Sequence, residues 1–457
     1  MRRNRGNATP CQWFALLTAF SWIGRLAVYG NLAGRSGRLA GTVCCGAWAQ
    51  DARADVSGLC RGSDRPGRPQ ERAADGGAGR GGQLLHFIAD GVWDSAPLEA
   101  ALLAEADRLV GGDEAFLVID DICLPKKGDR SVGVAPQYAS SLGKTANCQS
   151  LVSLTLASGE VPVMVGLRLF LPETWTGDPV RMARARVPED RQIALSKPEI
   201  AIAEIDRVWA AGVRFGCVLA DAGYGSSGPF RHALSTRGLA WAVGLSRRQN
   251  VYPVDVGLIF PEVGRGRRRK YHLPDRTAAS AEQMLEGEKW RKLSWRRGTK
   301  GRLTCRFAAT RVRIADGHKH RMADGRVQAM PGDEEVWLIG ERRATGERKY
   351  YASNLPADTS LEALAAAVKA RWICEQAHQQ LKEELGLDHF EGRSWTGLHR
   401  HALMTMTAYA FLQSRRLKAA GRAQKSPRTT PATDHASRQA SHHQRIRETP
   451  TNTMPSL

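Results

Sequence analysis

The sequence lacks the features that mark several large classes of protein. No uninterrupted apolar run reaches the roughly 18 residues that a membrane-spanning helix needs. The basic residues 1–5 and the apolar residues 13–20 are similar to the start of a secretion signal, but no A-x-A cleavage site follows them. We therefore expect neither a membrane protein nor a secreted one.

Cysteine is sparse and irregularly placed. The chain has 9 cysteines, an odd number, and no C-x-x-C pair. This arrangement argues against a zinc ribbon and against a disulfide framework. Reduced thiols of a cytoplasmic protein are the expectation.

Acidic residues are outnumbered. The 457 residues include 66 Lys and Arg but only 46 Asp and Glu, which gives a formal charge of +20. Such a charge favours a polyanionic partner, either nucleic acid or an anionic membrane surface, and nucleic acid is the better match for a chain without a membrane span. The hydrophobic content of 42% is ordinary, so the length predicts two or three globular domains with a sizeable core.

Two short apolar segments end in aspartate. Residues 114–121 close on Asp120 and Asp121, and residues 216–225 carry Asp221 before a glycine-rich turn. A helix predicted from Ser196 to Gly212 precedes the second segment, and helix followed by buried strand is typical of an α/β layer. Ligand groups in such folds gather at the carboxyl ends of strands, although either aspartate alone could simply be a turn residue.

A long helix is predicted over residues 359–390. Thr359 and Glu362 have the spacing of a capping box. Arg371, Glu375 and Lys382 recur on one face of this helix. Its apolar positions form a stripe that can pack on a core, listed here: Leu361, Leu364, Ala365, Val368, Trp372, Leu381 and Leu385. The charged face is either a solvated surface with i,i+4 ion pairs or a place for a metal ion and a phosphodiester.

These segments together resemble the bacterial insertion-sequence transposases of the DDE superfamily, which have a ribonuclease-H-like catalytic core. Arg371, Glu375 and Lys382 match the R-(3)-E-(6)-K part of the Y-(2)-R-(3)-E-(6)-K signature, while Val368 stands where the family has Tyr. Further blocks that resemble the family are VIDDICLPKKGDRSVGVAPQY (118–138), LGKTANCQ (142–149), LRLFLPETW (167–175), VLADAGYG (218–225) and LKEELGLDHFEGRSW (381–395). The resemblance covers about residues 84–420.

The resemblance implies a metal-dependent active site. Asp120, Asp221 and Glu375 would be the catalytic residues and the ligands of two Mg²⁺ ions, with Mn²⁺ as a substitute. Asp121 is the alternative first ligand, because the aspartate doublet leaves the choice open. Ile122 stands where the family usually has Thr, a departure beside the metal site.

The same resemblance implies contacts with DNA. Residues expected at the DNA are Arg371, Lys382, Lys126, Lys127 and Trp295. Trp295 either stacks on a base flipped out near the cut or packs on its own sheet. Three histidines, His389, His399 and His401, do not have the spacing of a metal site, so DNA contact or a structural role is expected for them.

The expected fold class is α/β, a ribonuclease-H-like mixed sheet flanked by helices and interrupted by a β-rich insertion. The predicted divisions are an irregular segment (1–82), the first part of the core (83–248), the insertion (249–352), the second part with the Glu helix (353–418) and a disordered basic tail (419–457). Within the core we predict a helix in residues 84–111, a hairpin that turns at Ser158-Gly159, and a strand at 239–247. The family's usual N-terminal helical domain is missing from residues 1–82, and a frameshift of residues 57–78 restores family-like sequence, so we expect this segment to be disordered or translated out of frame.

The function that follows is a DNA transposase that acts on transposon ends and target DNA as a homodimer in the cytoplasm. Two alternatives share the same residues. One is a metal-dependent nuclease without strand transfer, and the other is a catalytically silent DNA-binding remnant.

Overall fold

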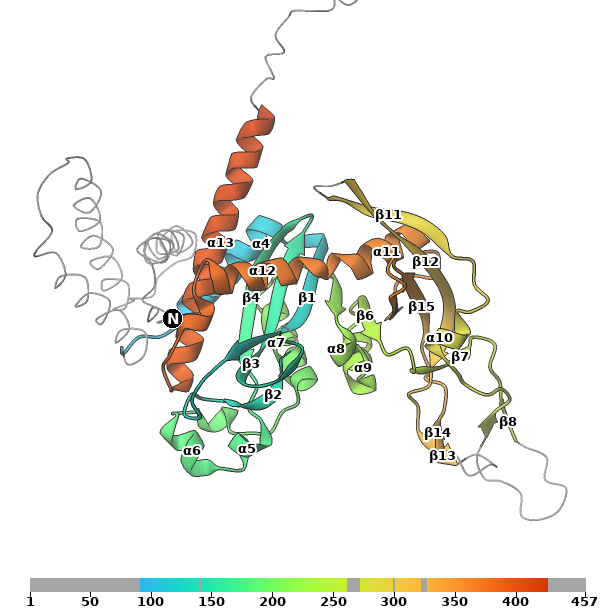
Figure 1. Ribbon diagram of the computed structural model, residues 1–457, viewed down its shortest axis with the longest axis horizontal. Coiled ribbons are helices and arrows are strands. Elements are labelled where there is room, and N and C mark those ends of the chain that lie inside the picture. The colour runs from blue at the N-terminus through green and yellow to red at the C-terminus, as the bar shows by residue number, and fades with distance from the viewer. Residues whose placement is uncertain (1–90, 140–141, 261–271, 299–300, 322–326, 426–457) are drawn as a thin grey trace, which may run out of the picture. The chain divides into compact units, whose positions relative to one another are not determined.

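The computed structural model describes residues 91–139, 142–260, 272–298, 301–321 and 327–425 (Figure 1). The predicted irregular segment at 1–82 lies outside these residues, as does most of the predicted tail. The chain divides into two compact units, Met1–Gln413 and Ser414–Leu457, and the described residues of the second unit, 414–425, are helical. The division into an insertion and two core parts stays a prediction.

Five strands of a large mixed sheet have the order β4-β3-β1-β5-β6. Their bounds are β1 (Gly112–Pro125), β3 (Lys144–Ser158), β4 (Val161–Leu169), β5 (Phe215–Ala220) and β6 (Trp241–Leu245). The β4–β3 and β3–β1 pairs are antiparallel, and the β1–β5 and β5–β6 pairs are parallel. This order and these directions confirm the predicted ribonuclease-H-like class. The hairpin between β3 and β4 turns at Ser158-Gly159 as predicted, with Gly159 at φ 58°.

Strand β1 is longer than the sequence predicts. It continues past Asp120 and Asp121 to Pro125, so the aspartates lie inside the strand and not at its end. The reason is that β1 has different neighbours on its two sides. The parallel pairing with β5 stops at Ile119, whereas the antiparallel pairing with β3 continues as far as Pro125.

Helices cover both faces of this sheet. The longer ones are α4 (Ala96–Val110), α7 (Lys197–Ala210), α9 (Gly228–Thr236), α11 (Leu361–Ala370), α12 (Trp372–Glu383) and α13 (Trp395–Lys425). Short helical segments are α5 (Glu173–Thr176), α6 (Pro179–Arg184), α8 (Ala222–Gly225) and α10 (Ala281–Met284), with 3₁₀ turns at Glu189–Arg191 and Leu387–His389. The helices predicted before β1 and before β5 are present as α4 and α7, and Ser196 caps α7 in a capping box with Glu199.

The predicted insertion is rich in β-structure and extends the same sheet. Its strands are β7 (Asn250–Pro253), β10 (Ala279–Ser280), β11 (Arg291–Gly298), β12 (Gly301–Ile314), β15 (Glu335–Arg342) and β16 (Arg348–Ser353). Two small hairpins stand apart, β8 (Leu258–Ile259) with β9 (Leu273–Pro274) and β13 (Lys319–Arg321) with β14 (Val327–Ala329). Strand β16 pairs with β6, so the insertion is joined to the core by backbone hydrogen bonds, and β2 (Ala135–Ala139) forms the opposite edge.

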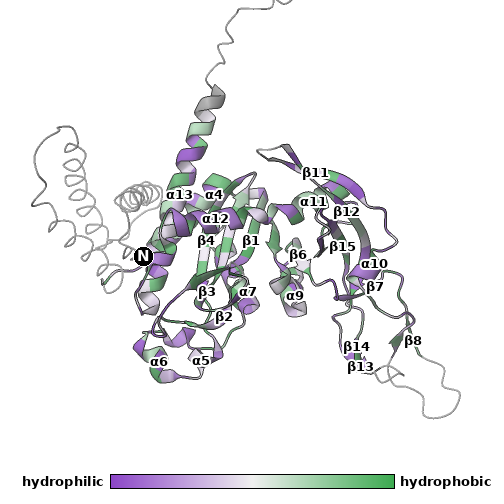
Figure 2. Cartoon of the chain, in the orientation of Figure 1, coloured by the Kyte–Doolittle hydropathy of each residue, from purple (hydrophilic) through white to green (hydrophobic). Residues whose placement is uncertain are grey.

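Two apolar clusters hold the sheet between its helices. The larger contains buried side chains of β1, β3, β4, α4, α7, α12 and α13, and the smaller joins α11 to β5, β12 and β15. Figure 2 shows the hydrophobic residues along β3 and β4 that belong to the larger cluster. Both clusters contain residues of the predicted Glu helix, so its two ends are packed on different parts of the sheet.

The predicted helix over 359–390 is two helices with a junction at Arg371. Arg371 keeps helical dihedral angles (φ −53°, ψ −31°), and α12 follows α11 in nearly the same direction (Figure 1). The predicted cap is wrong by one residue, since Ser360 and not Thr359 accepts a hydrogen bond from the Ala363 amide. Thr359 instead donates its amide to the Pro356 carbonyl, which places it in the preceding turn.

Helix α13 runs to Lys425, beyond the predicted start of the tail at residue 419. Among the residues that the structure describes, no helix combines the length and the apolar character that crossing a membrane requires.

Candidate active site

Asp120 and Asp221 follow directly opposed residues of two parallel strands. The β1–β5 pairing ends at Ile119 opposite Ala220, and the next residue on each strand is the aspartate. Asp221 caps α8, because its carboxylate accepts hydrogen bonds from the amides of Gly223 (2.9 Å) and Tyr224 (3.2 Å). Asp221 therefore follows the end of β5, as the sequence predicts, and Asp120 lies just past the end of the β1–β5 pairing but inside β1.

The pKa of Asp221 is raised. Burial is the larger cause and the negative charge of Asp120 is the next, while the hydrogen bond from the Tyr224 amide opposes them. The charge of Arg371 also opposes the shift, so the raised pKa reflects the burial of Asp221 and its proximity to Asp120.

The two members of the aspartate doublet face different partners. One Asp120 oxygen, Oδ2, accepts hydrogen bonds from Arg371 Nη1 (2.5 Å) and from the Cys374 thiol (3.2 Å). Both Asp121 oxygens have other donors, Lys197 Nζ at 2.6 Å and the Tyr224 hydroxyl at 2.6 Å. Successive residues of a strand point to opposite faces, so only Asp120 projects toward the Glu helix.

Arg371 links Asp120 to Glu375. Its Nη2 lies 3.1 Å from Glu375 Oε1, one helical turn along α12, while its Nη1 lies on Asp120. Burial alone would lower the pKa of Arg371, but the charge of Asp120 and the neighbouring Cys374 and Glu375 raise it. The Glu375 side chain is 53% exposed, so its carboxylate is open to solvent, whereas the Asp120 side chain is 17% exposed.

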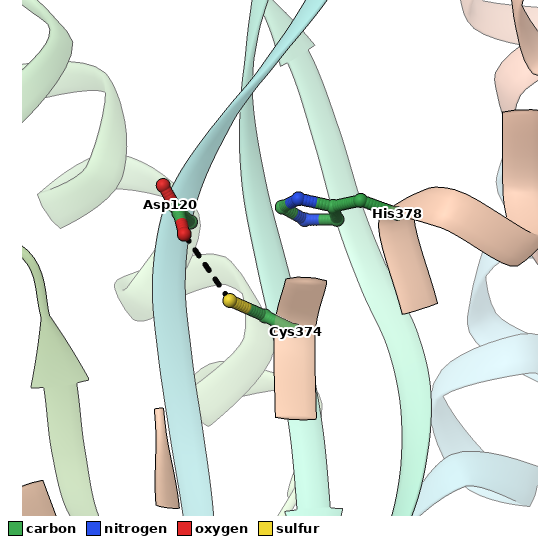
Figure 3. Close-up of side chains that lie close together, drawn as sticks. All are labelled: Asp120, Cys374 and His378. Atoms are coloured by element: carbon green, nitrogen blue, oxygen red, sulfur yellow. Dashed lines mark hydrogen bonds between the residues drawn. The ribbon is translucent and has the colours of Figure 1, made fainter. Parts of the chain in front are cut away.

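A second group of metal-ligand side chains shares Asp120. Figure 3 shows Cys374 and His378 projecting from α12 toward Asp120, and ligand atoms of the three lie within 4.8 Å of one another. Burial raises the pKa of the Cys374 thiol well above its usual value and lowers that of His378 to about 4, so both are neutral near pH 7. His378 Nε2 lies 3.0 Å from the Ser153 hydroxyl, which donates to the Asp120 carbonyl.

Cys374 and His378 were not among the site residues predicted from the sequence. Their signal was the i,i+4 spacing on the predicted helix, one residue before and three after Glu375. Sulfur and imidazole are softer ligands than Mg²⁺ prefers. In the structure the Cys374 thiol is instead a hydrogen-bond donor that fixes the Asp120 carboxylate.

The lysines expected at the DNA have different surroundings. Lys126 donates from Nζ to the Phe390 carbonyl (2.5 Å), and burial lowers its pKa. Lys127 is exposed in the turn after β1, and Lys382 is half-buried near the end of α12. Lys126 thus holds the turn after the Glu helix against the end of β1, and its contact with DNA stays a prediction.

Trp295 and Trp372 both lie where β11 meets the Glu helix. The Trp295 ring packs edge-on against Phe307, with ring centroids 6.1 Å apart, and Lys369 Nζ lies 4.4 Å from its centroid. Trp372 was predicted in the apolar stripe, and that is wrong, because it is 44% exposed. The Arg296 guanidinium of β11 lies 4.2 Å from the Trp372 ring and covers it in place of a core.

His399 and His401 have structural surroundings. Burial lowers the pKa of each to about 4. His399 Nδ1 lies 2.9 Å from the Trp395 carbonyl, and His401 Nε2 lies 3.1 Å from the Gly386 carbonyl. These contacts tie α13 to itself and to the turn that ends the Glu helix.

Family comparisons identify the chain. Residues 50–302, more than half of its length, match the model of the DDE superfamily endonucleases, and residues 198–411 match that of the transposase DDE domain. The chain belongs to the DDE superfamily of endonucleases. The predicted resemblance to insertion-sequence DDE transposases is thereby confirmed.

The DDE chain also has a curated relative. It is 31% identical over 149 residues to the probable transposase for insertion sequence element IS701 of Microchaete diplosiphon. The aligned region is 32% of this chain and 35% of that protein, so the chain spans about a third of the relative's length.

A solved structure of the piggyBac transposase synaptic complex with hairpin DNA also matches, at 11% identity and a TM-score of 0.33. That match covers 92% of this chain and 69% of the other. The fold of this chain is established by the order and directions of its strands and not by the match to the piggyBac complex. Members of the superfamily depend on divalent metal ions, and Asp120 belongs to a group of side chains that could hold one.

Proposed function

We propose that the chain is a DNA transposase of an insertion sequence, which cuts phosphodiester bonds at the ends of its element and joins them to target DNA. The observation that supports this most is the position of Asp120 and Asp221 on adjacent strands, with Glu375 joined to Asp120 through Arg371. The family comparisons support DNA transposition independently of this geometry.

The proposed metal ligands are Asp120, Asp221 and Glu375. Carboxylate oxygens are the donors that Mg²⁺ and Mn²⁺ prefer, and the negative charge of Asp120 contributes to the raised pKa of Asp221, which supports the proximity of these two acids. In the structure Arg371 supplies a positive charge between Asp120 and Glu375. When bound, a pair of Mg²⁺ ions would activate a nucleophile and stabilise the leaving oxygen of the phosphodiester.

We assign the first ligand to Asp120 and a supporting role to Asp121. Asp121 is already bonded through both oxygens to Lys197 and Tyr224, so it fixes β1 against α7 and the turn after β5. The Cys374 thiol holds Asp120 from the side of α12. These contacts keep the carboxylate of Asp120 in one orientation.

Arg371 and Lys382 are proposed to hold a phosphate next to the bond that is cut. Arg371 is charged and positioned between two of the acids, and Lys382 lies about three turns further along α12. In the cut, the oxygen of water bonds to phosphorus and the bond from phosphorus to the 3′ oxygen breaks, which leaves a 3′-hydroxyl on the element. In joining, that 3′ oxygen bonds to a target phosphorus and the target's own 3′ oxygen leaves with a proton. The chain's residues contribute by positioning and electrostatics.

The proposed partners are the element's ends and target DNA, bound by a homodimer in the cytoplasm. The formal charge of +20 is the observation that supports a polyanionic partner.

Cleavage of linear DNA that carries the element's ends, with Mg²⁺ present, tests the proposal. Asp221→Ala should abolish cutting while gel-shift binding of the same DNA persists. Asp333→Ala, which removes an exposed acid of the insertion, is the matched control and should cut at the wild-type rate. Cutting by Asp221→Ala at the wild-type rate would refute the site.

Two further assays separate the alternatives. Joining of pre-cut ends to a plasmid distinguishes a transposase from a nuclease that stops after the cut. A gel shift with the element's ends, combined with absent cutting by the wild type, identifies a silent remnant.

A further inference from the structure

Four cations stand opposite one another across four strands of the insertion. Lys292 on β11 pairs with Arg306 on β12, Arg306 pairs with Arg342 on β15, and Arg342 pairs with Arg348 on β16. Residues directly opposite in neighbouring strands project to the same face of a sheet. Lys292, Arg306, Arg342 and Arg348, here named the cation row, therefore form one line across the sheet.

The cation row faces away from the Glu helix. The positions next to it in each strand, Cys305, Phe307 and Glu341, belong to the other face, where Glu341 bonds to Lys369 of α11. The face of the cation row carries Gly340, against which Trp290 and Leu285 pack. The face of the sheet that carries the cation row is called the outer face. The row lies beside the packed part of this face, and the Glu helix with Glu375 lies on the opposite face.

A hollow opens over this row. Its volume is about 460 Å³, and all four members of the cation row line it, together with Thr304 of β12. Lys292, Arg306 and Arg348 are exposed and Arg342 is half-buried. Thr304 and Ser294, which pair with each other, lie two residues from Arg306 and Lys292 on the same strands, so their hydroxyls are on the same face.

The row is not neutralised within the part of the chain that the structure describes. Arg348 has one acid, Glu282, at 3.3 Å, and Arg342 lies over the ring of Trp290 at 3.9 Å. Among the described residues no carboxylate pairs with Lys292 or Arg306, and the buried Nε of Arg342 has no hydrogen-bond acceptor. Like charges directly opposite one another destabilise a sheet, and a bound polyanion would relieve this repulsion.

We propose that the cation row is a second DNA-binding site, which holds the phosphate backbone of duplex DNA away from the acidic edge. Strands lie about 4.8 Å apart, so the row extends over about 14 Å, a length in which one strand of duplex DNA carries about four phosphates. Two exposed hydroxyls and four cations favour contact with the phosphate backbone over base reading, and the one aromatic ring beside the row, Trp290, is covered by Arg342. The inference rests on the proposed function, since it adds a site to a protein that acts on DNA.

The cation row binds DNA that is not in the active site. A DNA segment on the outer face cannot be the segment held by Arg371, because β12 and β15 stand between them. The row therefore binds either a distant part of the same duplex or a second duplex. In the first case the affinity depends on the length of the duplex, and in the second it depends on how many duplexes are present.

Fluorescence anisotropy with a labelled duplex of random sequence, measured with EDTA present, tests the site without involving cleavage. Lys292→Gln/Arg306→Gln should bind about tenfold more weakly at moderate salt, and its log–log salt slope should be smaller by about two. The matched control is Arg247→Gln/Arg248→Gln, which removes the same charge from exposed positions off the row and should leave the slope nearly unchanged. Lys292→Arg/Arg306→Lys keeps both charges and should bind like the wild type.

The outcomes separate the inference from the proposed function. Wild-type affinity and slope in the Gln double variant would overturn the cation row while the active-site proposal stands. An equal loss in the Arg247/Arg248 control would assign the effect to net charge and would also overturn the row. If the wild type binds no duplex at all, both the row and the proposed function fail.

Discussion

The guanidinium of Arg371 lies 2.5 Å from the carboxylate of Asp120, although 251 positions separate the two residues in the chain. This contact joins the middle of β1 to the junction between α11 and α12. Since Arg371 also reaches Glu375, it aligns two of the three proposed metal ligands before any cation is bound.

The aspartate doublet gives the first prediction. Asp120→Asn should lower strand cleavage by about 10²–10³-fold or more, since it removes a charge at the reacting centre. Asp121→Asn should still cut, but it weakens the bonds to Lys197 and Tyr224 and should cost roughly 1–3 kcal/mol of unfolding free energy. Cleavage rates and urea unfolding of both variants check this. The reverse pattern would make Asp121 the ligand.

Arg371 should not be replaceable by lysine. Arg371→Lys keeps the charge but cannot contact Asp120 and Glu375 at once, because lysine has no planar fork. The loss of one charge-assisted hydrogen bond, about 1.5–3 kcal/mol, corresponds to roughly 10- to 150-fold in cleavage rate. Lys369→Arg is unsuitable as a control because Lys369 pairs with the buried Glu341, so Lys349→Arg serves instead. Full activity of Arg371→Lys would show that charge alone suffices.

Glu341 should stabilise the junction between the insertion and α11. It is fully buried, and its carboxylate accepts hydrogen bonds from Lys369 (2.8 Å), Arg343 (2.9 Å) and the Tyr351 hydroxyl (2.8 Å). Glu341→Gln leaves Lys369 without its carboxylate partner, while Arg343 keeps Glu347, so we expect a loss of about 3–5 kcal/mol in unfolding free energy at pH 7. Glu335→Gln on the same strand removes an exposed acid and should change it by less than about 0.5 kcal/mol.

The contribution of Glu341 should depend on pH. Burial alone would raise its pKa, but the hydrogen bonds from Lys369, Arg343 and Tyr351 lower it to about 2. A carboxyl whose pKa is lower in the folded state stabilises the protein fully above its unfolded pKa, about 4.3, and loses this contribution as the pH falls toward 2. Urea unfolding at several pH values should therefore show the wild type and Glu341→Gln converging below about pH 4. A constant difference down to pH 2.5 would contradict the assignment.

Replacing the two tryptophans at the junction, Trp295 and Trp372, should lower the free energy of unfolding by different amounts. Trp295→Ala removes a ring packed between Phe307 and Lys369 and should cost about 2–4 kcal/mol. Trp372→Ala removes an exposed ring with one cation–π contact and should cost less than about 1 kcal/mol. Thermal unfolding separates them. If Trp295→Ala is as stable as the wild type yet cuts poorly, the predicted stacking of Trp295 on a flipped base gains support over the packing role.

Much of the fold could be predicted from local patterns. The apolar run before Asp221, the turn at Ser158-Gly159 and the capping signals before α7 each depend on near neighbours in the chain, and each was found at the expected place. The run before Asp120 also forms a strand, but the pairing with β3 carries that strand on to Pro125. The strand order then follows from the short connections and from the rule that parallel strands need a helical crossover.

The sequence by itself determined which residue types could form the site, because the order of apolar and acidic residues is a property of the chain. Tertiary structure decided which of these residues face one another and which are buried. Whether Asp120 or Asp121 faces the Glu helix depends on the pleat and on where β5 ends, and the cap at Ser360 and the exposure of Trp372 depend on packing against a distant strand. The cation row was also invisible in the sequence, because its four members come from separate segments and only the pairing of β11, β12, β15 and β16 aligns them.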